Sequence, residues 1–199
     1  MESSAVVLAV LYLLLAIREN RWCWPAGIGS ALLYLFVFYG AGLYMQSALQ
    51  LFYVAMGAYG WWAWRPATGQ AIGAATGQAT GPPVLAIQRW PLRRHGLALV
   101  TIAGLSLASG WYLGHYSDSA VPYLDSFVTW SAVLTTWMVT RKVLENWLYW
   151  FVIDGVSLAL ALNQGLHLTA ALFALYLVLV VIGGRAWLAT WRRAAGPHP

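Results

Sequence analysis

Seven apolar segments, separated by short polar stretches, run through this chain of 199 residues and decide what it can fold into. Each segment is long enough, or nearly so, to cross the hydrocarbon core of a bilayer as a helix. Only 9% of the residues are charged, whereas a soluble domain carries about 25% charged residues. We therefore predict an all-α integral membrane protein with a single membrane domain over residues 1–199. The predicted transmembrane helices span residues 3–17, 22–39, 45–64, 96–114, 121–140, 146–162 and 168–187.

The basic residues indicate how these seven helices are oriented. All eleven Lys and Arg residues fall on one side of a seven-span topology, in alternate loops, at the end of the last span (Arg185) or in the C-terminal tail, and the opposite loops contain none. Because cytoplasmic loops carry an excess of Lys and Arg, we predict an outside N-terminus and a cytoplasmic C-terminus. Topology and contact with the lipid bilayer account for the formal charge of +5. We therefore expect no nucleic-acid partner.

Residues 65–95 separate the first three predicted helices from the rest. Repeated Thr-Gly-Gln and Thr-Gly-Pro sequences between Ala67 and Pro83 give part of this segment the composition of a flexible linker. We predict a flexible cytoplasmic loop over residues 65–95, without chemistry of its own.

The chain resembles itself when it is shifted by 126 residues. The aligned pairs are Glu19 with Glu145, Asn20 with Asn146, Trp24 with Trp150, Gly29 with Gly155, Gly57 with Gly183 and Trp61 with Trp187. Residues 1–64 then form a first three-helix repeat, residues 121–188 a second one, and residues 96–114 a linker helix. Two parallel repeats are a known transporter architecture, in which the substrate binds near mid-membrane between the repeats. Rocking of one repeat against the other would alternate access to that site.

Polar side chains inside the predicted helices mark a path for a substrate. They are costly in a membrane and usually face the interior of the helix bundle. Asn146, Trp150 and Asp154 recur at every fourth position and so share one helix face. A structural role in joining helices is the alternative for each of them. The candidate substrate-binding residues are Gln50, Tyr53, Trp61, Asp125, Thr129, Asn146, Trp147, Trp150 and Asp154.

The thirteen Trp residues are expected to divide between two roles. Aromatic belts at the membrane surface account for many of them, and we assign Trp22, Trp64, Trp90, Trp111 and Trp191 to these belts. Trp147 and Trp150 instead flank the polar face that contains Asp154. Aromatic rings beside a carboxylate suit a flat, cationic ligand, which gains from stacking and from cation–π attraction.

These residues also carry a family resemblance. The stretch Asp125-x15-Arg141-Lys142-x2-Glu145-Asn146-Trp147-x2-Trp150-x3-Asp154 resembles the signature second half of the PnuC family of nicotinamide riboside transporters. Matching segments in the first half are Arg18-Glu19-Asn20-x-Trp22-x-Trp24, Leu49-Gln50-x2-Tyr53 and Tyr59-Gly60-Trp61-x2-Trp64. The resemblance covers nearly all of the chain except the Thr-Gly-Gln linker and the tail.

The resemblance implies a bacterial inner (plasma) membrane carrier for a vitamin precursor, with a SWEET-like 3+1+3 arrangement of helices. It implies facilitated diffusion by alternating access, with a cytoplasmic kinase that phosphorylates the substrate and traps it. It also implies a homo-oligomer, a trimer. Asp125 and Asp154 would then be substrate-binding or gating residues, since no ion coupling is required.

The substrate and the functional class leave alternatives open. Members of this family take nicotinamide riboside, thiamine or riboflavin, and the first two are both cationic and aromatic; riboflavin fits the carboxylates less well. A membrane-embedded enzyme with Asp125 and Asp154 as paired carboxylates is an alternative of another class. The sequence has no nucleophile elbow, phosphate loop or His- and Cys-rich cluster to support it. We therefore expect no catalytic residues, no metal and no cofactor.

Overall fold

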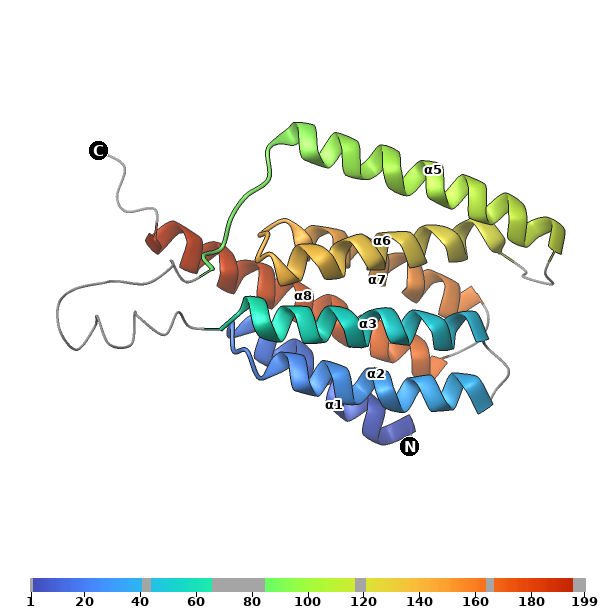
Figure 1. Ribbon diagram of the computed structural model, residues 1–199, viewed down its shortest axis with the longest axis horizontal. Coiled ribbons are helices and arrows are strands. Elements are labelled where there is room, and N and C mark those ends of the chain that lie inside the picture. The colour runs from blue at the N-terminus through green and yellow to red at the C-terminus, as the bar shows by residue number, and fades with distance from the viewer. Residues whose placement is uncertain (1, 41–43, 66–84, 117–120, 164–166, 195–199) are drawn as a thin grey trace. The chain divides into compact units, whose positions relative to one another are not determined.

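The computed structural model describes residues 2–40, 44–65, 85–116, 121–163 and 167–194. These residues form seven α-helices and confirm the all-α fold (Figure 1). The helices are α1 (Glu2–Ile17), α2 (Cys23–Gly40), α3 (Tyr44–Ala63), α5 (Leu92–Tyr116), α6 (Pro122–Thr140), α7 (Asn146–Asn163) and α8 (His167–Ala194). The low-complexity part of the predicted loop lies outside the described residues.

Two helices extend at one end by four residues or more beyond the predicted transmembrane segments. α5 begins at Leu92 instead of residue 96, and α8 continues to Ala194 instead of residue 187. The carbonyl of Pro91 accepts a hydrogen bond from the amide of Arg94 at 2.9 Å and so helps to start α5 among charged residues. Hydropathy marks the part of a helix that lies in hydrocarbon, but the helix itself can continue into the polar interface, where its Arg side chains are solvated.

Length and composition make some helices stronger membrane spans than others. Leu92–Tyr116 and Ala170–Ala194 are each long and apolar enough to cross a bilayer, whereas Ser4–Ile17 and Cys23–Val37 are apolar but shorter. Short spans are accommodated by local thinning of the bilayer or by polar ends that reach to the interface.

The described chain divides into two compact units, and each is described by itself. The first unit contains α1, α2 and α3, together with Val139–Lys142 and the chain from Ala186 onward. The second unit contains Arg89–Met138 and Val143–Arg185, and therefore α5, α7 and most of α6 and α8.

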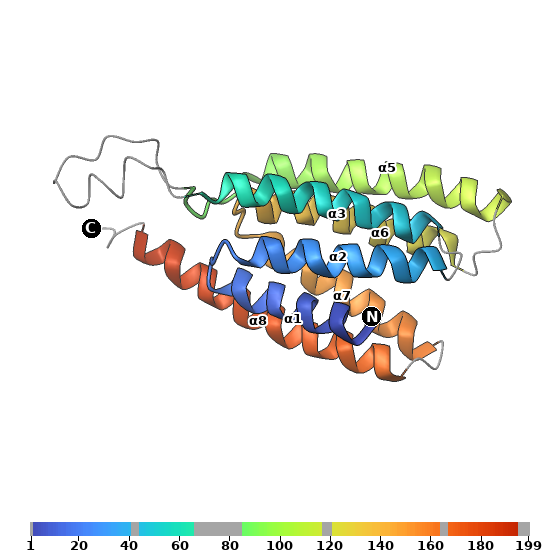
Figure 2. The ribbon, with the colours of Figure 1, turned by 60° about the horizontal axis from the view of Figure 1, so that its bottom comes forward.

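In the first unit, α2 packs against both α1 and α3 (Figure 2). Trp24, at the start of α2, is almost fully buried, and its ring lies over Gly60 of α3. A Cβ atom at Gly60 would come within 2.3 Å of that ring, so glycine is required for this close approach. Trp24 also makes edge contacts with Tyr12 and Trp64, at ring-centroid distances of 5.9 and 5.3 Å.

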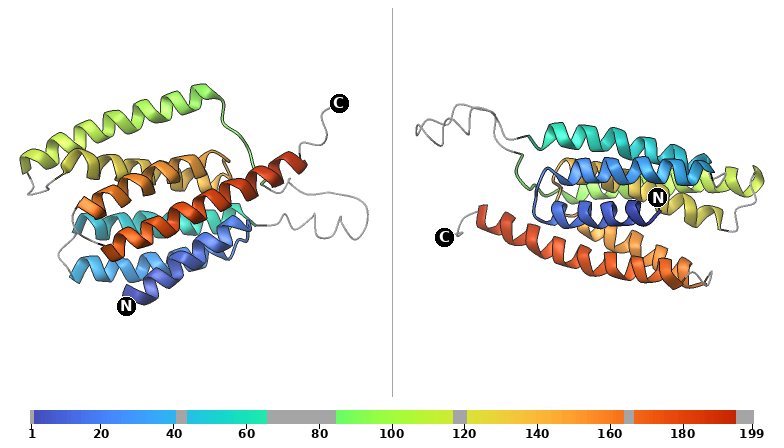
Figure 3. Two further views of the ribbon diagram at one scale, coloured as in Figure 1. Left: turned by 180° about the vertical axis from the view of Figure 1, so that it is seen from behind. Right: turned by 90° about the horizontal axis from the view of Figure 1, so that it is seen from below.

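In the second unit, α5 approaches α6 at the C-terminal end of α5, as the green and yellow helices show in Figure 3 (left). There, a Cβ atom at Gly110 would lie 2.5 Å from the Tyr123 ring, and Nε1 of Trp130 donates a hydrogen bond to Oγ of Ser109 at 3.1 Å. Between α7 and α8, the ring of Trp147 covers Gly183, where a Cβ atom would lie 2.4 Å from it.

Several pairs of helix ends lie 123 residues apart, three fewer than the sequence shift of 126. α2 and α7 begin at Cys23 and Asn146, and α3 and α8 begin at Tyr44 and His167. The same offset relates the Trp24–Gly60 contact to the Trp147–Gly183 contact. The sequence register was therefore wrong by almost one helical turn, because it paired Glu19, inside a turn, with Glu145, which directly precedes a helix.

The turns that follow α1 and α6 share one capping geometry. Glu19 and Lys142 both adopt a positive φ, of 53° and 49°. Around Glu19, the amide of Glu19 bonds the carbonyl of Ala16 at 3.0 Å and the amide of Asn20 bonds that of Leu15 at 2.9 Å. This pair of bonds is a Schellman motif, which satisfies the last carbonyls of the helix. Lys142 occupies the same place after α6, again 123 residues along the chain.

Candidate substrate-binding residues

Three of the nine predicted site residues lie along one face of α7. Asn146, the first residue of the helix, is fully buried, and its Nδ2 donates a hydrogen bond to the carbonyl of Val143 at 2.6 Å. Its Oδ1 is buried and accepts no hydrogen bond from the described residues. Trp150 follows one turn later and is half-buried. Asp154 is 5% exposed and lies about 12 Å along the axis from Asn146.

Trp147 faces another direction from this row. Its ring is buried against Gly183, and its Cβ lies 3.3 Å from the position that a Cβ would take at Gly184. The ring therefore holds α7 against α8. A contact between Trp147 and substrate stays a prediction.

The two predicted residues on α6 lie one turn apart. Asp125 is exposed in the first turn of α6, and Thr129 is half-buried. A carboxylate in the first turn of a helix is stabilised by the helix dipole, so a structural contribution accounts for Asp125 as readily as a substrate contact does. Both roles at Asp125 and Thr129 stay predictions.

On α3, the structure places two of the predicted residues near each other and one far from them. Gln50 is buried and Tyr53 is half-buried, less than one turn away. Trp61 lies about 16 Å along the helix from Gln50. There, the guanidinium carbon of Arg21 lies 3.7 Å from the Trp61 ring centroid, and the Trp22 ring makes an edge contact at 5.2 Å. Trp61 is thus held by the turn between α1 and α2.

The assignment of Trp64 to an aromatic belt is wrong. Its side chain is 6% exposed, and its Nε1 donates a hydrogen bond to the carbonyl of Thr140 at 3.1 Å. It also lies beneath Nζ of Lys142, 4.8 Å from the ring centroid. The prediction rested only on the position of Trp64 at the end of a span. In the structure, this indole instead bonds the end of another helix. Trp22 and Trp111 are exposed, as a belt requires.

Sequence reasoning missed an ion pair at the helix turns of the first unit. Nζ of Lys142 lies 2.8 Å from Oε2 of Glu19, and both side chains are largely shielded from solvent. Each residue occupies the positive-φ position of its Schellman motif. Lys142 is the only lysine in the chain, which could have drawn attention to it. The sequence could not identify its partner, because Glu19 is more than a hundred residues away.

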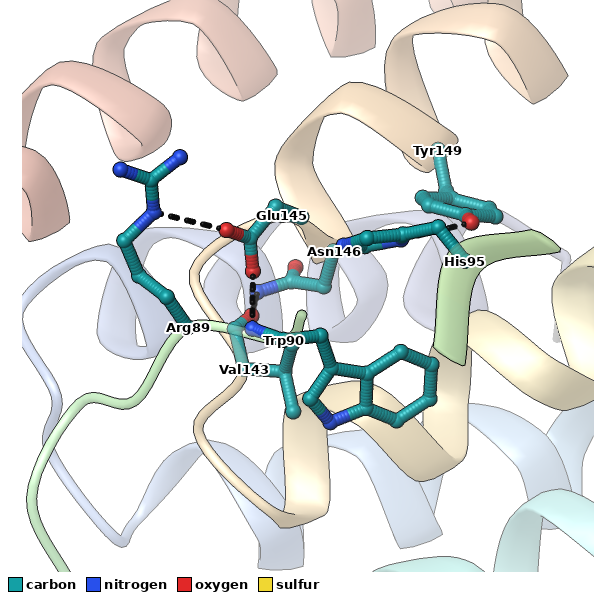
Figure 4. Close-up of polar contacts among 7 residues, drawn as sticks. All are labelled: Arg89, Trp90, His95, Val143, Glu145, Asn146 and Tyr149. Carbon is teal, nitrogen blue, oxygen red and sulfur yellow. Dashed lines mark hydrogen bonds and ion pairs between the residues drawn. The ribbon is translucent and has the colours of Figure 1, made fainter. Parts of the chain in front are cut away.

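A second polar cluster lies in the second unit (Figure 4). Three of its residues, Arg89, Trp90 and His95, belong to the segment that was predicted as a flexible loop without chemistry of its own. Oε1 of Glu145 accepts a hydrogen bond from Nε of Arg89 at 2.9 Å, and Oε2 accepts one from the backbone amide of Trp90 at 3.2 Å. Close by, Nδ1 of His95 and the hydroxyl of Tyr149 are 3.0 Å apart. Glu145 thus fixes the residues just before α5.

The seven helices and the buried polar residues of α3 and α7 fit one class of protein, a helical membrane transporter. The crystal structure of the vitamin B3 transporter PnuC matches with a TM-score of 0.73 at 21% identity, covering 96% of this chain and 82% of that one. The family model described as nicotinamide mononucleotide transporter matches residues 1–189. The chain therefore belongs to this family, which is the PnuC family.

Curated relatives agree with this assignment. The chain is 25% identical over 191 residues to the riboflavin/roseoflavin transporter RibM of Streptomyces davaonensis, covering 96% of this chain and 85% of that protein. It is 24% identical over 211 residues to the nicotinamide riboside transporter PnuC of Escherichia coli, covering 94% and 84%. The protein is thus a vitamin transporter of the PnuC family and not an enzyme. The alternative of a membrane-embedded enzyme with Asp125 and Asp154 as paired carboxylates was therefore wrong.

Proposed function

We propose that the protein carries nicotinamide riboside across the membrane by facilitated diffusion. The observation that supports this choice of substrate is the position of Asp154, buried at the middle of α7 on the face that also carries Asn146 and Trp150. A pyridinium ring offers both a positive charge for the carboxylate and a flat face for the indole. Asn146 adds a buried carbonyl oxygen that a hydroxyl or amide of the substrate could bond.

Electrostatic cost favours a cation over an uncharged ligand. An ionised carboxylate in a low-dielectric interior is expensive unless a positive charge accompanies it. Nicotinamide riboside and thiamine supply such a charge, and riboflavin does not. On α3, Gln50 and Tyr53 are the further residues that we assign to the substrate.

Riboflavin is the second candidate, because RibM is as similar to this chain as the nicotinamide riboside carrier is. Thiamine shares the cationic aromatic character on which the first proposal rests. The buried carboxylate of Asp154 is what separates riboflavin from the other two.

The remaining parts of the proposal follow from the family and from the charge pattern. We place the protein in a bacterial inner membrane, with the N-terminus outside and the C-terminus in the cytoplasm, because all Lys and Arg then face the cytoplasm. We further propose two parallel three-helix repeats with a linker helix, a trimer, and trapping of the substrate by a cytoplasmic kinase.

Thermal stabilisation by the three vitamins tests the substrate. A ligand that binds only the folded protein stabilises it by about 2.7 kcal/mol at one hundred times its dissociation constant. We expect nicotinamide riboside to raise the melting temperature of the detergent-purified protein most, and riboflavin least. The Asp154→Asn variant should lose most of the nicotinamide riboside shift. A shift with riboflavin alone would move the assignment to the RibM type of carrier.

A further inference from the structure

The second unit contains a groove between α5, α6 and α7 that the proposed transport mechanism does not use. Its volume is about 380 Å³, and apolar side chains form most of its wall. The principal ones are Leu99, Ile102, Phe127, Leu148, Val152 and Ile153. The groove residues of α7 are centred about 130° round that helix from the face of Asn146, Trp150 and Asp154, and Ile153 borders that face, about 20° from Asn146.

Most of the polar side chains of the groove lie at one end. His95 on α5 and Tyr149 on α7 line this end beside Leu92 and Leu148, and Leu99, Ile102, Val152 and Ile153 follow further along the two helices. On the side of α6, Phe127 and the buried Ser131 complete the wall. From one end to the other the groove covers about 10–15 Å of helix. A polar end followed by this length of apolar wall matches the change from head group to acyl chain within one leaflet of a bilayer.

The polar end carries an excess of positive charge. Arg89 and Glu145 form an ion pair there (Figure 4), and the Arg89 side chain is 57% exposed while that of Glu145 is 14% exposed. The outer part of the guanidinium therefore reaches the surface. Arg93 and Arg94 follow in the first turn of α5 and are both exposed. Of these three arginines only Arg89 lines the groove, so an anion at this end would meet the Arg89 guanidinium.

The apolar wall is open to its surroundings. Leu99 and Val152 are exposed, and Leu148 is 65% exposed. In a membrane protein, such a wall at this depth meets lipid chains and not water.

We propose that this groove binds an anionic phospholipid, with one acyl chain against the apolar wall and the phosphate on Arg89. Arginine binds phosphate oxygens through parallel N–H bonds, and basic sites between transmembrane helices are typical places for anionic head groups. A helix of a second copy is about 10–12 Å wide with its side chains and would fill roughly 1,200 Å³ over the same length. The groove volume of about 380 Å³ suits a single chain of methylene groups instead.

Native mass spectrometry of the full-length protein, released from detergent with added phosphatidylglycerol, tests the proposal. We expect one phosphatidylglycerol to stay bound per chain, and phosphatidylethanolamine to be retained several-fold less. Arg89→Gln should lower phosphatidylglycerol retention at least fivefold. Arg93→Gln is the matched control, because it removes the same charge from an exposed position in the first turn of α5 that does not line the groove. It should change retention less than twofold.

A second variant tests the acyl-chain position and does not depend on the Arg89–Glu145 pair. Leu148→Trp adds bulk at an exposed wall position, so it should fold as the original does and still reduce lipid retention several-fold. Equal losses from Arg89→Gln and Arg93→Gln would overturn the proposal in favour of a diffuse basic surface. Normal retention in Leu148→Trp, or equal retention of the two phospholipids, would also overturn it. A change of oligomer mass in Leu148→Trp without lipid loss would identify the groove as a contact between copies.

Discussion

At the scale of the residue, the substrate proposal depends most directly on Asp154. We expect Asp154→Asn to lower the affinity for nicotinamide riboside about tenfold or more, because interactions with a charged group contribute about 1.5–3 kcal/mol. Uptake of the labelled substrate into proteoliposomes measures this. Asp125→Asn, which removes an exposed carboxylate from the first turn of α6, is measured beside it. An equal loss in both variants would assign both carboxylates to the substrate path, and a loss in Asp154→Asn alone would leave Asp125 with its structural role. Normal uptake by Asp154→Asn would assign Asp154 to structure alone.

The ion pair between Lys142 and Glu19 should contribute to stability. Its side chains are 9% and 22% exposed, so its loss should cost more than the roughly 0–1 kcal/mol of an exposed pair and less than the roughly 3–5 kcal/mol of a fully buried one. We expect Lys142→Met and Glu19→Gln each to lower the melting temperature in detergent. The double variant should recover part of the loss, because neither charge is then left alone. Strictly additive losses would show that the two side chains do not interact.

At the scale of the element, the two Trp–Gly contacts determine how closely neighbouring helices pack. A Cβ atom at Gly183 would lie 2.4 Å from the Trp147 ring, whereas one at Gly104 would have no atom within 4 Å. We expect Gly183→Ala to destabilise the protein by about 1–3 kcal/mol through overpacking. Gly104→Ala should be neutral or slightly stabilising, since alanine favours a helix over glycine. Thermal melts of both variants in the same detergent test this prediction. Equal melting temperatures would contradict close packing of Trp147 on Gly183.

The seven helices could be predicted from the sequence, but the residue-by-residue alignment of the first half of the chain with the second could not be predicted accurately. Apolar length and loop charges placed all seven helices, because the membrane excludes unpaired backbone groups and leaves few options. The register of the repeat was wrong by three residues, because identical residues such as Glu19 and Glu145 occupy different places relative to a helix start. Trp24 with Gly60 and Trp147 with Gly183 give the right register, but that pairing requires knowing which tryptophan covers which glycine.

At the scale of the whole molecule, burial is what the sequence predicted least well. The periodicity of α7 correctly placed Asn146, Trp150 and Asp154 on one face, because spacing alone determines a helix face. It could not distinguish Trp64, which bonds the carbonyl of Thr140, from an interfacial tryptophan. Nor could it detect that Glu145 bonds Arg89 and Trp90, because these long-range contacts leave no periodic signal. Hydropathy reports how apolar a side chain is, and not which carbonyl its polar atom reaches.

Facilitated diffusion of a cation makes a quantitative prediction for the intact carrier. With no coupled ion, nicotinamide riboside should equilibrate across a proteoliposome membrane according to its own charge. Without a membrane potential, the inside concentration should rise to the outside value and stop. An inside-negative potential of 100 mV acts on one charge with about 2.3 kcal/mol, which corresponds to roughly fifty-fold accumulation.

Labelled uptake at a series of potassium-diffusion potentials measures this dependence. The logarithm of the accumulation ratio should rise with potential at a slope of one charge, and an enclosed kinase with ATP should add accumulation as phosphorylated product. Protein-free liposomes at the same potentials provide the control. Because pathway residues such as Asp154 return to their starting state after each cycle, their own charge alters the rate and not the final ratio. Accumulation at zero potential driven by a proton or sodium gradient would contradict facilitated diffusion and require a coupled ion.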